Sequence, residues 1–452
     1  MSDAAANTTA FQETPEYRQE LLGPLRSKAL VVGFAGLVAF GVLGGILVGI
    51  GQAEAQQFMT AYLVAFVFWV SMSLGSLFFQ CIFYVTGGRW GILMRRPMEA
   101  NMRTWALGLV LFIPVAATMF AGKSSIYWWA GHHPGEHAAE HKDGDKPAEE
   151  AKAHGPFHRH TVVKPNLEID EDNKVKEYLN PVFTVIRGLL LFGAIGAAIF
   201  WVLRNADRAE NDPDEDAARR VRNKQKYAAS VGLVVFTLSM TVIATDWVMS
   251  LDKTFASSMF PIIMFDDAAV MSYAFGMLVI LHLKAKKHPH FETLFPATEQ
   301  VHLGSMLLAF TLAWTYFNFS QYMLMWIGNL PEEIPYYLKR VNGGWQYYGI
   351  LMTIFHFFVP FLLLLFRHVK SDPKALRFIA IGLIVVCATD VFWWINPSLN
   401  IHEHSYVYWL MDIAAWVGVG GIWVWYFLGQ LIKRPLLPTR ERYILEVYNH
   451  GH

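Results

Sequence analysis

Long apolar runs separated by short polar stretches recur along all 452 residues. A helix needs about 20 apolar residues to cross a bilayer core of about 30 Å. Ten runs of this kind can be marked, at 29–50, 58–84, 104–122, 183–203, 227–250, 268–283, 303–327, 347–366, 378–395 and 406–432. The sixth is the shortest and can recruit residues 262–265. The pattern predicts an all-α, polytopic integral membrane protein with about ten transmembrane helices.

Lysine and arginine are distributed unequally between the polar segments. Segments on the side of the amino terminus hold 25 of the 37, whereas the short loops of the opposite side hold 3. The others lie in one long segment, and long segments translocate largely regardless of charge. Positive residues favour the cytoplasmic side of short loops. The bias therefore predicts that both termini are cytoplasmic.

The same pattern divides the chain into five parts. They are a cytoplasmic segment 1–28, helices one to three in 29–121, a periplasmic insertion 122–182, helices four to ten in 183–432 with a cytoplasmic loop 204–226, and a cytoplasmic tail 433–452. The insertion is rich in histidine and poor in apolar residues, so it is predicted to be partly disordered. His137 and His141 are spaced for one helical face and could ligate a metal, but a solvated loop is favoured.

Composition narrows the possible functions. Hydrophobic residues make up 54% of the chain, and the basic and acidic residues balance at 37 each, which argues against a nucleic-acid partner. Cys81 and Cys387 lie in apolar runs and are predicted to be small buried residues. Motifs for covalent haem, iron–sulfur clusters, dinucleotides and P-loops are all missing. We therefore predict no catalytic residue, no bound cofactor and no metal in this chain.

Ionisable residues inside apolar runs are costly and by default indicate a functional site. Three acids are expected in the periplasmic half of the bilayer, and three further groups toward the cytoplasmic half. The candidates for proton transfer are Asp246, Asp390 and Asp412 on the first side, and His356, His302 and Glu299 on the second. The alternative is that these groups are satisfied within the helix bundle or anchor it at the interface.

Two loops opposite the termini can be read as a surface for partner subunits. They cover 252–267 and 329–340, and their candidate residues are Asp252, Glu332, Glu333 and Arg340. The alternative for the acidic pair is a solvated turn.

Several of these stretches together resemble a known family. They are residues 62–91 with Thr86-Gly-Gly-Arg-Trp-Gly, residues 246–251 reading Asp-Trp-Val-Met-Ser-Leu, residues 321–333, and residues 356–366. The chain resembles the ActF subunit of bacterial alternative complex III, within the wider family of NrfD/PsrC-like membrane subunits. This resemblance implies paired four-helix bundles plus extra helices, in the bacterial inner (cytoplasmic) membrane.

The resemblance also implies partners and a role. The complex is a quinol:electron-acceptor oxidoreductase, so quinol or menaquinol, haem and iron–sulfur centres are expected in partner subunits. Those partners would be an NrfD-like sibling in the membrane, periplasmic iron–sulfur and c-type haem subunits, and lipid. Residues 253–260 lack the histidine associated with quinol in the sibling. The implied role is structural, with proton conduction as a further role open to this chain. A quinol-binding catalytic subunit and a secondary transporter remain the alternatives.

Overall fold

The computed structural model describes residues 13–49, 55–87, 90–122, 125–131, 178–211, 215–330, 334–399 and 406–438. All regular secondary structure in these ranges is helical, which confirms the predicted all-α class for them. The α-helices are α2 (Pro15–Gly49), α3 (Ala55–Thr86), α4 (Trp90–Met102), α5 (Trp105–Thr118), α8 (Pro181–Asn211), α9 (Glu215–Ile243), α10 (Phe260–Ala285), α11 (Pro289–Leu294), α12 (Ala297–Gly328), α13 (Pro335–Arg340), α14 (Trp345–Thr353), α15 (Val359–Leu365), α16 (Arg367–Ser371), α17 (Pro373–Ile395) and α18 (Tyr406–Ile432).

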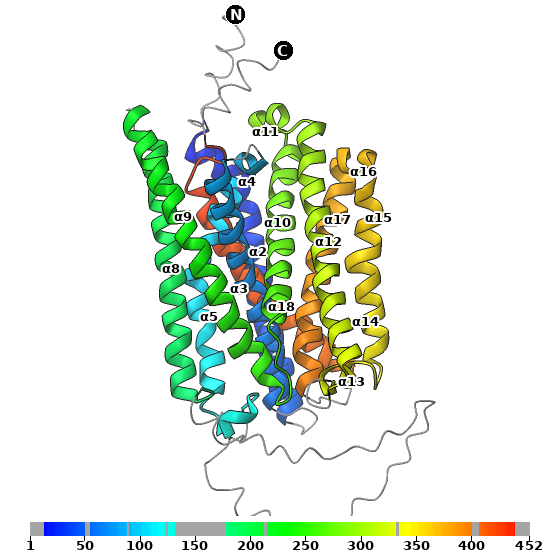
Figure 1. Cartoon of the computed structure of the whole chain (residues 1–452). Coiled ribbons are helices and arrows are strands. Elements are labelled where there is room, and N and C mark those ends of the chain that lie inside the picture. The colour runs from blue at the N-terminus through cyan, green and yellow to red at the C-terminus, as the bar shows by residue number, and fades with distance from the viewer. Residues whose placement is uncertain are drawn as a thin grey trace, which may run out of the picture.

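Five short segments complete these helices. Two are π-helical: η3 (Ala244–Val248) follows α9, and η5 (Ile354–Phe358) joins α14 to α15. The others are the 3₁₀ turns η2 (Trp128–Gly131), η4 (Met249–Leu251) and η6 (Asn396–Leu399). The long helices run side by side along one direction, with α3 and α10 near the middle (Figure 1).

Two groups of four helices meet along α3 and α10. In the first group α3 packs on α5 and α9, and α8 packs on both α5 and α9. In the second, α10 packs on α12 and α17, while the rod formed by α14, η5 and α15 packs on α12 and α17. The helices α2 and α18 form a separate pair that lies against α3. The predicted apolar core is thus shared by three sets of helices.

The start of α2 and the end of α18 lie at the same side of the bundle. Nε of Arg18, near the start of α2, donates to the carbonyl oxygen of Ile432 at the end of α18, at 2.8 Å. Residues 125–131 close the opposite end, where the hydroxyl of Tyr127 donates to the carbonyl of Trp247 at 3.2 Å. Residues 125–131 and the start of α8 therefore lie at the end of the bundle away from α11 and α16 (Figure 1).

Nine helices of the described ranges are long and apolar enough to cross a membrane, against the ten predicted spans. The difference is the predicted span 303–327. It is a continuous helix, α12, of 32 residues, but polar side chains such as Asn318 and Gln321 lower its mean hydropathy. The sixth predicted span does gain the turn before residue 268, because α10 begins at Phe260.

The segment between the second and third predicted spans contains a short helix. Residues 90–102 form α4, and Arg95 and Arg96 are buried. Both guanidinium groups pair with Glu99, at 2.8 Å and 2.7 Å, and with Glu210 on α8. This ion-pair network holds α4 against the end of α8.

Candidate functional site

A histidine and an aspartate meet in the interior of the second helix group. Nδ1 of His356 lies 2.5 Å from Oδ2 of Asp390 on α17, and both side chains are buried. His356 lies in the π-helical segment η5. Pro360, four residues further on, has no N–H to bond to the carbonyl of His356, so the regular helical ladder is interrupted there. π-helical turns are frequent at functional sites.

Asp267 and Cys387 complete this site, which we call the His356 centre (Asp267, His356, Cys387 and Asp390). Oδ1 of Asp267 lies 4.0 Å from Nε2 of His356. Cys387 is one helical turn before Asp390 on α17, and its thiol faces Asp267. The close approach of Gly75 on α3 to the backbone of Ala268 fixes the depth of α10 here.

Negative charge exceeds positive charge at the His356 centre. Asp266, next to Asp267, is also buried, and neither of its oxygens has a hydrogen-bond partner among the described residues. The same holds for Nε2 of His356 and Oδ1 of Asp390. The imidazole of His356 lies within 4.0 Å of two of these three carboxyl groups, those of Asp267 and Asp390. A buried charge without a partner is costly, so protons or a bound cation must balance this excess.

The four side chains are of types that can bind a metal. Their ligand atoms all lie within 4.8 Å of one another. Histidine, cysteine and aspartate are the ligands that zinc takes in tetrahedral sites. The sequence predicted no metal site in this chain, so this juxtaposition is a feature that sequence reasoning missed.

An aromatic cleft leads toward the His356 centre from the α13 end of the bundle. Its volume is about 580 Å³, and its lining includes Tyr336, Arg340, Gln346, Gln321 and Trp314. Trp314 forms the inner wall, because its ring stacks on the imidazole of His356 with centroids 4.0 Å apart. A single indole therefore separates the cleft from the histidine.

The structure corrects two sequence-based placements. His356 and Asp390 were assigned to opposite halves of the bilayer, but they are in direct contact. Residues 266 and 267 were included in an exposed rim, but they lie inside α10 and are buried. The signal for Asp267 was present in the sequence, because an earlier start of the sixth helix places both acids within an apolar run.

Asp246 lies elsewhere, in the π-helical segment η3, and it has a cation partner. Its carboxylate accepts hydrogen bonds from Nε and Nη2 of Arg187 on α8, at 2.5 Å and 2.8 Å. The guanidinium group also stacks over the ring of Tyr178, 3.9 Å from its centroid. Sequence reasoning did not single out Arg187, although it lies within the predicted span 183–203.

The other three proton-transfer candidates are not brought to the His356 centre. Asp412 is half-buried on α18 and interacts electrostatically with Tyr348, as does Asp390. Glu299 and His302 lie in the first turns of α12, at the end of the bundle where α2 starts, and His302 is exposed. No hydrogen bond or ion pair joins these three residues to His356 within the described ranges.

The predicted partner surface is only partly exposed. Asp252 is buried but bonds to Nζ of Lys339 at 2.8 Å, and that lysine is about one-third exposed. Arg340 points inward and donates to the carbonyls of Tyr336 and Trp394, so it cannot face a partner as predicted. Burial lowers the pKa of its guanidinium group. Glu332 and Glu333 lie outside the described residues.

No protein-family model matches the chain, and a search of curated proteins finds no match either. The function is therefore argued from the His356 centre, together with the family resemblance of the sequence.

Proposed function

We propose that this chain is a proton-conducting membrane subunit of a quinol:electron-acceptor oxidoreductase, similar to the ActF subunit of alternative complex III. The observation that carries the proposal is the buried His356 centre, in which an imidazole lies between two carboxyl groups. Ionisable groups at this depth in an apolar bundle are costly, and in membrane proteins they commonly form proton relays.

The geometry suits transfer through the imidazole ring. A proton on Asp267 can pass to Nε2 of His356 through a water molecule, or directly once a small movement shortens the 4.0 Å gap to hydrogen-bond distance. The proton on Nδ1 then passes to Oδ2 of Asp390 along the 2.5 Å contact. The ring gains one proton and releases one, so its own charge is unchanged afterwards. Histidine is suited to this step because its unperturbed pKa, about 6.5, lies near physiological pH.

The aromatic cleft gives this relay a route to the α13 end. Gln321, Asn318 and Gln346 supply polar groups along the cleft, and Trp314 stands between it and His356. On the other side, Glu299 and His302 lie at the end of α12 and can collect protons from water. The connection from that end to Asp267 would need water molecules or a small movement of the helices.

The family resemblance supplies the rest of the proposal. In it, electrons leave quinol through iron–sulfur and haem groups on periplasmic partners, and this chain packs beside an NrfD-like sibling. The two four-helix groups and the additional pair α2 and α18 agree with the bundle arrangement that the resemblance implies. The α13 end, with Lys339 accessible, would face the periplasmic partners, in the inner membrane of a bacterium.

The test uses Asp390→Asn in the assembled complex reconstituted into liposomes. Asparagine is nearly isosteric, so the packing of α17 should persist while the acid is lost. We expect the variant complex to assemble normally and to oxidise quinol at the normal rate when no proton gradient opposes it. It should, however, release fewer protons per electron. His356→Gln should have the same effect. The matched control is His368→Gln, because His368 is an exposed histidine on α16, outside the His356 centre.

Two results would contradict proton conduction through the His356 centre. One is an unchanged proton yield in both variants while the complex assembles normally. The other is a stoichiometric metal in the purified native chain that is lost in Cys387→Ser, because a metal ion would then balance the charge of the three acids. Isolation of the chain without any electron-transfer partner would contradict the assignment to an oxidoreductase complex.

A quinol-binding role is the second candidate, because the aromatic cleft also fits a flat ring. Aromatic side chains with a few polar groups are typical of small-molecule sites, and 580 Å³ lies in their usual size range. Gln321 and Arg340 could bond to the quinol oxygens. A photoreactive quinone that labels Tyr336 or Trp314 would favour this role, and labelling confined to the sibling subunit would exclude it.

A further inference from the structure

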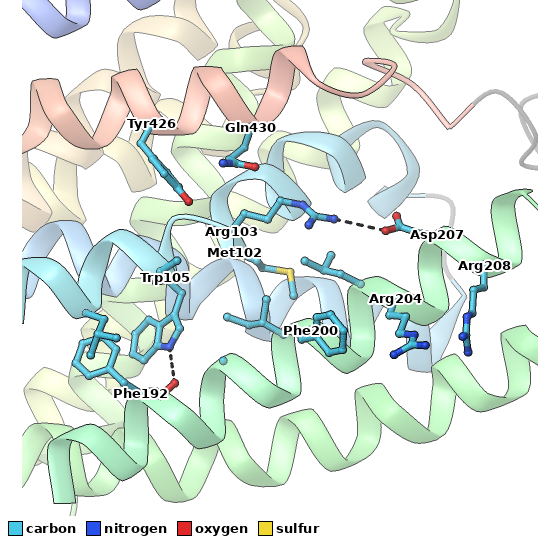
Figure 2. Close-up of a pocket in the computed structure, with 15 residues that line it drawn as sticks. Met102, Arg103, Trp105, Phe192, Phe200, Arg204, Asp207, Arg208, Tyr426 and Gln430 are labelled. Carbon is cyan, nitrogen blue, oxygen red and sulfur yellow. Dashed lines mark hydrogen bonds and ion pairs between the residues drawn. The ribbon is translucent and has the colours of Figure 1, made fainter. Parts of the chain in front are cut away.

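A second pocket lies in the first helix group, at the end of the bundle where α8 and α18 end. It is lined by residues of α5, α8 and α18. Its volume is about 640 Å³ (Figure 2). One part is apolar and is lined by Trp105, Leu109, Phe192, Ile199 and Phe200. The other part, toward the end of α8, is lined by Arg103, Arg204, Arg208, Tyr426 and Gln430, together with Asp207. The pocket therefore has an apolar body and a cationic mouth.

The sequence of α8 produces this division along one face of the helix. Gly196, Phe200, Arg204 and Arg208 follow one another at intervals of four residues, so they lie on the same face, and all of them line the pocket. Glycine leaves space at the deep end, where a Cβ at Gly196 would meet only Trp105, at 3.8 Å. The guanidinium group of Arg204 stands 5.7 Å from the ring centroid of Phe200, at the boundary between the two parts.

The cationic mouth has more positive charge than its own acid can balance. Among the described residues that line the pocket, Asp207 is the only acid, and it pairs with Arg434, whose Nη2 lies 2.7 Å from Oδ2. Arg103 reaches the same carboxylate only at 3.7 Å, and its Nε has no hydrogen-bond partner in the described ranges. Arg204 and Arg208 are exposed and make no hydrogen bond or ion pair there. The guanidinium groups of Arg204 and Arg208, together with the long-range pair partner Arg103, are thus available to bind an anion.

We infer that this pocket binds one anionic glycerophospholipid, with the phosphate at Arg103, Arg204 and Arg208 and an acyl chain along Phe200, Ile199 and Leu109. Guanidinium groups donate paired hydrogen bonds to phosphate oxygens. Basic pockets between transmembrane helices on the cytoplasmic side bind anionic lipid headgroups. The mouth lies at the end of the bundle that the charge bias predicts to be cytoplasmic. The apolar wall continues directly from the mouth, which a soluble phosphate would not require.

The test is native mass spectrometry of the full-length chain in detergent, titrated with palmitoyl-oleoyl phosphatidylglycerol or with the matching phosphatidylcholine. We expect at least tenfold tighter binding of the anionic lipid. Each basic residue near a lipid surface contributes about 1 kcal/mol, or about fivefold in affinity. The double variant Arg204→Gln with Arg208→Gln should therefore weaken phosphatidylglycerol binding about 25-fold. The matched control replaces Arg222 and Lys224, two exposed cations on α9 outside the pocket, with glutamine.

A second variant separates the two parts of the pocket. Gly196→Leu leaves every charge in place but fills the apolar body, so it should also weaken binding of phosphatidylglycerol. In a separate competition experiment, inorganic phosphate at millimolar concentration should not displace the lipid. Equal binding of both lipids, or unchanged binding in the double arginine variant, would overturn the inference. Full competition by phosphate would do so as well, because it would show an anion site without a lipid.

Discussion

At the scale of single residues, the ion pair between Arg187 and Asp246 gives the first prediction. The carboxylate is buried and the guanidinium side chain is only 13% exposed. Removing one partner of a buried pair leaves an uncompensated charge and typically costs about 3–5 kcal/mol. Arg187→Met should therefore destabilise the chain by about that amount, measured as the free energy of unfolding in detergent titrated with dodecyl sulfate.

The double variant Arg187→Met with Asp246→Leu provides the control. It removes both charges, and apolar replacements of a buried pair are often neutral, so most of the stability should return. A pair that acts only structurally would leave proton release per electron unchanged in the double variant. A lowered proton yield from a stable double variant would instead indicate that Asp246 takes part in proton transfer, as the sequence predicted.

The residues of the His356 centre show how far single-residue reasoning reaches. Asp390 and His356 could be selected because they interrupt apolar runs, and both prove to be buried. Their contact could not be predicted, because 34 residues separate them and the rotation of two helices decides which side chains face each other. Asp267 was missed for a different reason: a helix start placed a few residues too late turned two buried acids into loop residues.

At the scale of elements, the contact of α2 with α18 gives the second prediction. A Cβ at Gly33 would lie 2.6 Å from the backbone nitrogen of Ile422, and one at Gly36 would lie 2.7 Å from Cα of Gly418. Backbone atoms cannot move aside as a flexible side chain can. Small residues allow such close approach of helices in membranes. Gly33→Ala should therefore separate the pair and destabilise the chain by about 1–3 kcal/mol.

The same helix carries a matched control. Gly41 is also in the interior of α2, but a Cβ there meets no atom within 4 Å. Gly41→Ala should be neutral or stabilising by up to about 1 kcal/mol, because alanine is the better helix former. Unfolding free energies measured under the same conditions compare the two variants. Equal effects at both positions would show that helix propensity, rather than the contact with α18, governs stability here.

Element boundaries were predicted better than element partners. The last predicted span, 406–432, coincides with α18, and the run 58–84 lies within α3. Apolar periodicity and length determine such boundaries. The pairing of α2 with α18 joins the two ends of the chain, and no local pattern indicates it. Likewise, the burial of Arg95 and Arg96 has no local signal, because one of their partners, Glu210, lies on the distant helix α8.

At the scale of the whole molecule, the two ends of the helix bundle and the charges beside them give the last prediction. The start of α2 and the end of α18 lie together, and residues 125–131 close the other end of the bundle. The polar segments beside the first end hold 25 lysines and arginines, against 3 in the short loops of the other. Positive residues near helix ends are retained in the cytoplasm. Reporter fusions after Lys226 and after Arg442 should therefore be cytoplasmic, and one near Lys152 should be periplasmic.

The fusion near Lys152 decides most, because it follows three helices and precedes seven. A cytoplasmic signal there would mean that one of α2, α3 or the combined α4 and α5 does not cross the bilayer. The fusion after Arg442 tests α12 in the same way. If α12 failed to cross because of its lower hydropathy, nine crossings would leave the carboxyl terminus in the periplasm. Six predicted spans, including α12, lie between Lys226 and Arg442. A cytoplasmic signal at both positions therefore agrees with crossing by all six, whereas loss of α12 alone would leave an odd number and place Arg442 in the periplasm.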